Sequence, residues 1–147
     1  MKLLLPLIFA LLSGIAMAVQ GSLNSILGKI VGLLEATFIV HVIGLILVAV
    51  VIFGLKMGDG GLAKLPEVPW YAYLGGLINV FIIYGVVASI PKIGVANATT
   101  AIIVGQVTTA LIIDCTGMFG LEKFPLSWTK IIGVVLLAGG AKLMLIR

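Results

Sequence analysis

Residues 96–120 read ANATTAIIVGQVTTALIIDCTGMFG, a stretch long enough to cross the hydrocarbon of a bilayer as one helix. Thr99, Gln106 and Thr109 recur along nearly one side of such a helix, because an α-helix turns once in about 3.6 residues. Lipid cannot hydrogen bond to an amide, so a polar stripe at this depth must face other helices or a water-filled cavity. The stretch therefore predicts a membrane helix in a bundle with a polar interior.

The whole chain has the composition of an integral membrane protein. Of its 147 residues, 62% are hydrophobic and only 10% are charged, whereas charged residues make up about a quarter of a typical soluble domain. The formal net charge is +4, but the lysines stand singly at the ends of apolar runs, where they can reach the membrane interface. The sequence has no basic cluster with interleaved aromatic residues, so we expect no nucleic-acid partner.

Five apolar runs, separated by glycine, proline and charged residues, predict a single all-α transmembrane domain of five helices over residues 1–147. Trp70 and Trp128 open the third and fifth runs, as expected for an interfacial aromatic belt. Pro91 and Lys92 are expected to end the third helix. The predicted helices cover about residues 3–29, 33–56, 70–90, 94–116 and 126–146.

The first run also resembles a secretory signal peptide. It has a positive start at Lys2 and an A-x-A site at Ala16–Ala18. Apolar residues nevertheless continue for about three more turns, and Ser13, Gln20 and Asn24 share one face, which a discarded leader does not need. We therefore expect an uncleaved first transmembrane helix.

Neutral amides lie near the midpoints of three predicted helices, each within about 6 Å at a rise of about 1.5 Å per residue. Amides at one depth favour a hydrogen-bonding substrate cavity; the alternative is interhelical hydrogen bonds that only hold the bundle together. Asn24 and Thr99 extend the same polar faces. The candidate substrate-binding residues are Gln20, Asn24, Asn79, Thr99 and Gln106.

Two further residues are candidates for proton coupling or gating. His41 lies about two turns into the second run, and histidine is the side chain whose charge changes near neutral pH; the alternative is a packed structural histidine. Asp114 follows Gln106 by about two turns, where it could also be a solvated charge at a helix end. The sequence shows no zinc-ligand spacing, phosphate loop or nucleophile–base set, so we expect no cofactor, no metal and no enzymatic activity.

Positive charges are almost evenly divided between the two sides that five crossings define. Lysine and arginine asymmetry sets the orientation of membrane proteins, so near balance predicts that the chain inserts both ways. Two copies in opposite orientations would form an antiparallel homodimer of ten helices, like a transporter built from inverted repeats. One side holds five residues, Lys2, Lys56, Lys64, Lys123 and Lys130, and the other four, Lys29, Lys92, Lys142 and Arg147.

Motifs across essentially the whole chain resemble the YdcZ-type family, five-helix bacterial inner-membrane proteins of the drug/metabolite transporter superfamily. The most specific patterns are A-x-x-x-Q-x-x-x-N, from Ala16 to Asn24, and G-Q followed by D-x-x-G-x-F-G, from Gly105 to Gly120. The resemblance implies a multi-pass inner-membrane half-transporter that dimerises with itself or with a paired relative. Other matching positions are Leu27, Gly75, Gly76, Pro91, Gly94, Pro125 and Gly133.

The chain is also similar in size to the four-helix small multidrug resistance proteins. Their first helix carries a glutamate that binds proton and cation, whereas this chain has Gln20, which cannot titrate. The sequence therefore favours a transporter of a small solute that works by alternating access in a dimer. The alternatives are a passive channel, which would need a continuous polar lining, and a non-transporting membrane assembly subunit.

The charge balance leads to a first prediction. The double substitution Gly60→Lys and Gly61→Lys should lock one orientation, because positive charges in short loops govern topology. A cysteine added at one terminus should be labelled from both membrane faces in the wild-type chain and from one face in this variant. If the wild-type chain, expressed without a paired family member, were labelled from one face alone, that result would contradict insertion in both orientations.

Overall fold

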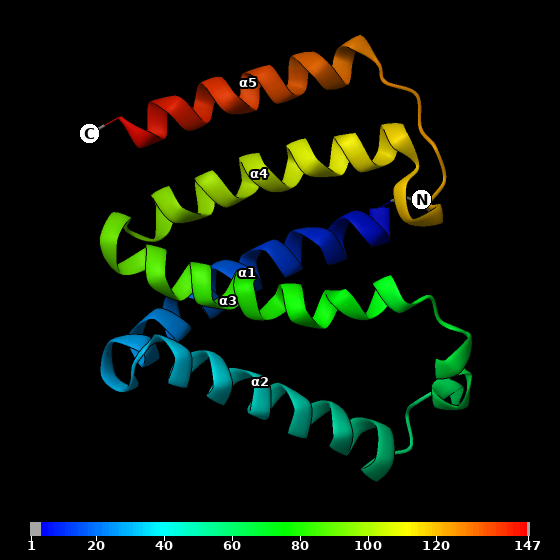
Figure 1. The fold of residues 1–147 in the computed structure, drawn as a ribbon. Coiled ribbons are helices and arrows are strands. Elements are labelled where there is room, and N and C mark those ends of the chain that lie inside the picture. The colour runs from blue at the N-terminus through cyan, green and yellow to red at the C-terminus, as the bar shows by residue number, and fades with distance from the viewer. Residues whose placement is uncertain (1–3, 147) are drawn as a thin grey trace. The chain divides into compact units, whose positions relative to one another are not determined.

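The computed structural model describes residues 4–146, and these residues form helices without any strand (Figure 1). Five stretches are long and apolar enough to cross a membrane, which confirms the predicted five-helix, all-α class. Lys2 and Arg147, which entered the charge count, lie outside the described residues. The helices are α1 (Leu4–Val31), α2 (Leu33–Ala49), α3 (Leu74–Ile93), α4 (Val95–Thr116) and α5 (Trp128–Leu145).

The helices fall into two compact units. The first unit ends at Lys92 and holds α1, α2 and nearly all of α3, whereas the second begins at Ile93 and holds α4 and α5. Two of the connections between helices are single glycines, Gly32 and Gly94, at φ values of 105° and 85°. A side chain is disfavoured at such positive φ values, so glycine permits these single-residue connections.

Several helix boundaries differ from the predicted ones. α3 begins at Leu74 rather than at residue 70, because Trp70–Tyr73 forms a separate 3-10 turn. α3 continues through Pro91 to Ile93, because a proline this close to a helix end removes only a terminal backbone hydrogen bond. α2 gives way to η1 (Val50–Gly54), a π-helical turn in which the Leu55 N–H donates to the Val50 carbonyl at 2.9 Å. The chain then leaves the helix at Lys56, whose φ of 54° is left-handed.

The first unit is held together by small residues on α1. A Cβ at Gly21 would lie 3.0 Å from Val86 of α3 and 3.1 Å from Ile90. Gly28 faces Val87 of α3 even more closely, and Ala36 of α2 lies beside it. Small residues let helix backbones approach closely, which is how membrane helices pack without a hydrophobic driving force. The buried stripe on α1 consists of Gly21, Asn24, Ser25 and Gly28.

The second unit is a pair of antiparallel helices, α4 and α5, which run side by side (Figure 1). The loop between them folds back on α4, since the Phe124 N–H donates to the Asp114 carbonyl at 2.9 Å. Ser127 caps α5 by accepting the Lys130 N–H at 3.3 Å. Across the pair, the Thr100 hydroxyl donates to the Met144 sulfur at 3.5 Å.

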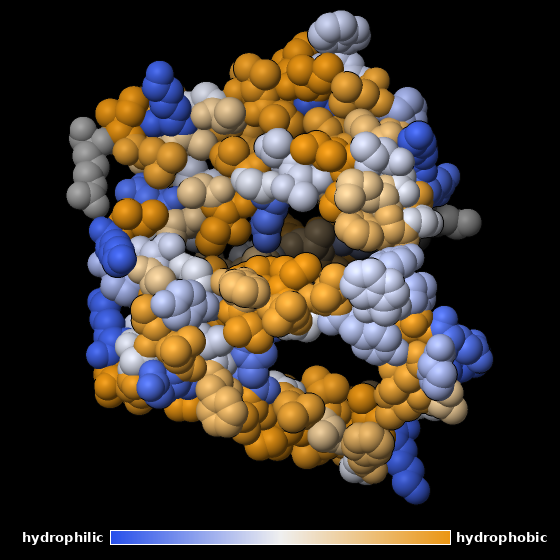
Figure 2. Space-filling view, viewed as in Figure 1, coloured by the Kyte–Doolittle hydropathy of each residue, from blue (hydrophilic) through white to orange (hydrophobic). Residues whose placement is uncertain are grey.

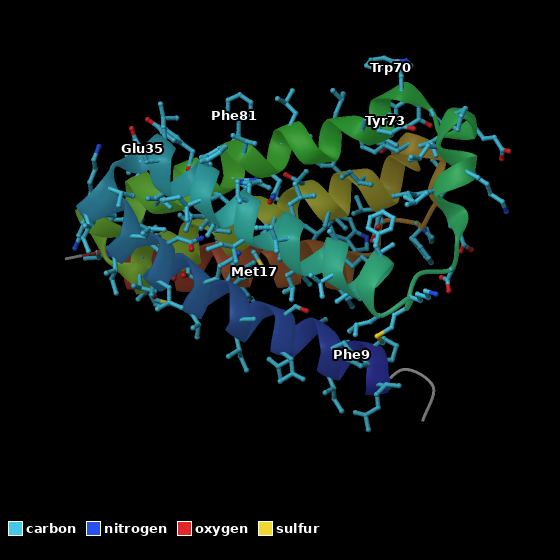
Figure 3. All side chains as sticks on the ribbon, turned by 90° about the horizontal axis from the view of Figure 1, so that it is seen from below. Phe9, Met17, Glu35, Trp70, Tyr73 and Phe81 are labelled. Atoms are coloured by element: carbon cyan, nitrogen blue, oxygen red, sulfur yellow. The ribbon has the colours of Figure 1, made fainter. Side chains whose placement is uncertain are left out.

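Most large apolar side chains point away from the chain. In Figure 2, hydrophobic residues cover most of the helix flanks and hydrophilic residues gather mainly near the helix ends. Phe81 is 70% exposed and Trp70 75% exposed, and both project outward from their helices in Figure 3. Surfaces of this kind are covered by lipid or by other membrane helices.

The packing of Gly28 leads to a second prediction. Gly28→Ala should lower the unfolding free energy by roughly 1–3 kcal/mol relative to Gly14→Ala, because its new methyl group would overlap Val87. Gly14 is a matched control, since nothing lies within 4 Å of a Cβ built there, and both changes gain the same helix propensity.

Thermal unfolding of the purified chain in detergent measures this difference. Adding Val87→Ala to the Gly28→Ala chain should restore part of the loss. Equal stability of the two alanine variants would show that α1 and α3 do not meet at Gly28.

Candidate functional site

Two residues that the sequence marked separately lie together between α2 and α3. The side-chain amide nitrogen of Asn79 lies 3.0 Å from Nε2 of His41. The other ring nitrogen, Nδ1, lies 2.7 Å from the backbone carbonyl of Thr37, one turn earlier on α2. Both nitrogens of the imidazole are therefore engaged, one within its own helix and one across to the next.

The Thr37 carbonyl determines the tautomer of the neutral His41 ring. A carbonyl oxygen can only accept a hydrogen bond, so Nδ1 must carry the proton and donate it. Nε2 of the neutral ring is then an acceptor, which matches the amide nitrogen that Asn79 presents to it. The ring, the carbonyl and the amide thus form one consistent chain of donors and acceptors.

The local fold keeps His41 in this position. Thr37 is only 3% exposed, and its hydroxyl donates to the Leu33 carbonyl at 2.8 Å. The N-terminal half of α3 is far less covered, since residues 74–82 are exposed in the chain. The Asn79–His41 hydrogen bond therefore ties a sparsely packed part of α3 to the well-packed side of α2.

The candidates on α1 occupy different environments. Asn24 is 7% exposed and belongs to the small-residue packing stripe. Gln20 lies outside that stripe and is exposed in the chain. No hydrogen bond joins either amide to the His41–Asn79 pair in the described part of the chain. The structure thus brings together two of the predicted polar residues of this unit and leaves the other two apart from them.

In the second unit, the predicted residues of α4 lie away from α5. At about 100° per residue, Gln106 and Thr99 fall within about 20° of each other and roughly 140–160° from Ala101, which faces α5. Gln106 is exposed, and its amide makes no hydrogen bond with the residues described. This face of α4 is therefore available to a solute, to water or to protein outside the α4–α5 pair.

Two acidic residues of the spans, the predicted candidate Asp114 and also Glu35, lie at helix ends. Asp114 is partly exposed near the C-terminus of α4 and holds the following loop through its backbone carbonyl. Glu35 lies in the first turn of α2 and is exposed (Figure 3), as the favourable interaction of a carboxylate with a helix N-terminus suggests. Within residues 4–146, no three His, Cys, Asp or Glu side chains gather to hold a metal.

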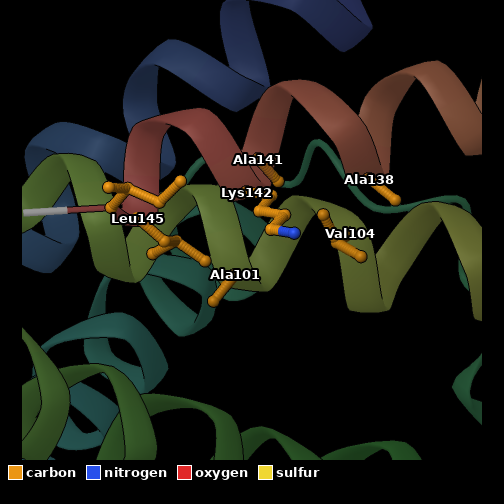
Figure 4. A pocket seen from close by; sticks show the side chains of 7 residues that line it. Ala101, Val104, Ala138, Ala141, Lys142 and Leu145 are labelled. Atoms are coloured by element: carbon orange, nitrogen blue, oxygen red, sulfur yellow. The ribbon is translucent and has the colours of Figure 1, made fainter.

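A groove between α4 and α5 was not anticipated from the sequence (Figure 4). It has a volume of about 460 Å³, and its lining contains none of the predicted site residues. The sequence signal for this groove is the pair Ala138 and Ala141 on α5, which lies opposite Ala101 on α4. Apart from one lysine its walls are apolar, which suits an acyl chain or another helix better than a polar solute. The lining residues are Ala101, Val104, Ala138, Ala141, Lys142, Leu145 and Ile146.

A family model described as "Putative inner membrane exporter, YdcZ" matches residues 5–143. The chain belongs to this family. No curated protein and no solved structure matches the chain. Membership of the YdcZ family confirms the resemblance and the multi-pass inner-membrane location predicted from the sequence. The family is one of exporters rather than enzymes, and its match spans nearly all of the five helices.

The pair across α2 and α3 leads to a third prediction. In a double-mutant cycle of His41→Leu and Asn79→Leu, the coupling in unfolding free energy should be about 0.6 kcal/mol, the average measured for interhelical hydrogen bonds in a membrane, and at most about 1.7 kcal/mol. The matched control cycle combines Gln20→Leu with Asn79→Leu, and these two effects should add. Additivity in both cycles would contradict a hydrogen bond between His41 and Asn79.

Proposed function

We propose that this YdcZ-family protein exports a small, hydrogen-bonding solute by alternating access in a dimer. The observation that carries the proposal is that the mid-helix amides of Gln20 and Gln106 make no hydrogen bond with the described residues. An amide at membrane depth is costly without a partner. A solute passing through the membrane is a partner that an exporter must bind and then release.

The composition of the spans suggests the class of solute. Neutral amides both donate and accept hydrogen bonds, so they suit groups such as amides, hydroxyls and ureas. Carboxylates are confined to helix ends, at Glu35 and Asp114, so no acidic side chain is placed at the midplane to bind a permanent cation. A small, polar solute without net charge fits these groups best.

A dimer supplies the second half, of opposite orientation, that a single five-helix chain lacks. Inverted-repeat transporters place the solute at the interface of two halves of opposite orientation, and the near balance of positive charges allows one chain to supply both halves. The exposed Gln106 face of α4 would then contribute one amide from each copy to a shared cavity. The two compact units, which meet near Gly94 in the sequence, offer bodies that could move against each other during the cycle.

The fourth prediction tests the amide directly. Gln106→Leu should reduce solute affinity by roughly 1–3 kcal/mol, the cost of leaving a buried partner unpaired. It should leave thermal stability nearly unchanged, because the Gln106 amide bonds to no described residue of the chain. Thr108→Val is the matched control, since it also removes a polar group from α4 but lies about 160° away around the helix.

The measurement is efflux from reconstituted vesicles loaded with a panel of small amides, polyols and ureas. Wild-type flux should saturate with solute concentration, and Thr108→Val should retain it. Flux without saturation would indicate a channel, and no flux for any solute would indicate a non-transporting subunit. Loss of stability in Gln106→Leu with normal flux would show that the amide only holds helices together.

A further inference from the structure

The His41–Asn79 pair has a property that neither residue has alone. Asn79 carries a donor and an acceptor on the same planar group, so a half-turn of its amide exchanges one for the other. His41 needs an acceptor at Nε2 when protonated and a donor there when neutral. The residue opposite Nε2 can therefore satisfy both protonation states without any movement of the helices.

We propose that His41 and Asn79 form a proton-binding site that takes up and releases one proton in each export cycle. The binding of the proton is independent of the function proposed above, whereas its coupling to solute movement rests on that function. His41 is the single histidine of the chain, and it lies within the membrane-spanning stretch Leu33–Gly54. The ligand is a proton from water, and no other co-reactant is needed.

The proton exchange involves few atoms. In the neutral state, Nδ1–H donates to the Thr37 carbonyl and Nε2 accepts from the Asn79 amide nitrogen. A proton from water binds to the lone pair of Nε2, and the Asn79 amide turns so that its oxygen accepts the new N–H. The Nδ1–H bond to Thr37 is retained throughout. Release returns the proton to water on the other side of the membrane and turns the amide back.

The surroundings of the pair make proton binding depend on conformation. The helices packed against α2 carry Lys29 on α1 and Tyr84 and Lys92 on α3, and Glu35 lies on α2 itself. None of these groups is hydrogen bonded to His41 in the described chain. Glu35 precedes His41 by six residues, or about 9 Å along the helix. Among residues 4–146, the protonated ring therefore has two hydrogen-bond acceptors but no acidic side chain paired with it.

A cation of this kind is costly in a dry environment and is stabilised when water reaches it. A conformational change that opens the pair to one aqueous side would favour loading of the proton, and closure would favour its release. The site thus links proton occupancy to the alternation of access. The N-terminal half of α3, where Asn79 lies, is exposed at every position from 74 to 82, so little packing hinders such a change.

Nitrogen NMR of the full chain in lipid bilayers tests proton binding without requiring transport. With ¹⁵N-labelled histidine and asparagine, the lone histidine should be the Nδ1–H tautomer in alkaline solution, with ¹⁵N–¹⁵N coupling from Nε2 to the Asn79 amide. In acid both ring nitrogens should be protonated, and that coupling should disappear as the amide oxygen replaces the nitrogen. Asn79→Leu should remove the coupling at alkaline pH, which assigns it.

An Nε2–H tautomer in alkaline solution, or a coupling that persists in the doubly protonated ring, would overturn the proton site. Coupling to transport is tested by efflux under an imposed pH gradient. The gradient should accelerate wild-type efflux, His41→Gln should lose this response, and Tyr84→Phe should keep it. An equal response in His41→Gln would overturn the coupling. Absence of wild-type flux would overturn the proposed function and leave the NMR result to decide the proton site.

Discussion

The need to pair every polar group inside a bilayer shapes this molecule more than any other constraint. Backbone groups are paired within the helices themselves. Some hydroxyl side chains are also paired within their own helix, since Ser13, Ser22 and Ser89 each donate to the carbonyl four residues earlier, at 2.8, 2.9 and 2.6 Å. Amides are not paired in this way here, so they remain to bind a neighbouring helix or a solute. The chain thereby divides its polar residues into those satisfied locally and those available for function.

Packing of small residues determines which amides remain available. The glycines of the α1 stripe let Val87 of α3 approach closely at Gly28, and Asn24 is buried in the same stripe. Gln20, four residues earlier, falls just outside it and stays exposed. Two residues of one motif thus have different surroundings because the helix crossing covers only part of the polar face.

The first unit contains the hydrogen-bonded His41–Asn79 pair, and the second contains an exposed amide face on α4 with an apolar groove on the opposite side. Membership of an inner-membrane exporter family gives these features a common context. A titratable ring with a reversible partner is suited to a proton, and an unpaired amide is suited to a polar solute. An exporter that couples the two would need no acidic residue at the membrane midplane, and the mid-helix position on α1 carries Gln20, which has no charge.

The sequence by itself determined the class of the protein. The length and apolar composition of a segment, and the glycine and proline residues that end it, are local properties, and they decide for each segment separately whether it can cross a bilayer as a helix. It gave the five helices and the residues worth considering as a site. It did not predict the continuation of α3 past Pro91 or the π-helical turn after α2, which depend on local backbone geometry. It also did not predict the α4–α5 groove, which depends on how two helices face each other. Only the tertiary structure could join His41 to Asn79, since they are 38 residues apart. Helical periodicity fixes the direction of a side chain on its own helix, whereas contact across helices depends on how small residues such as Gly28 let the backbones approach.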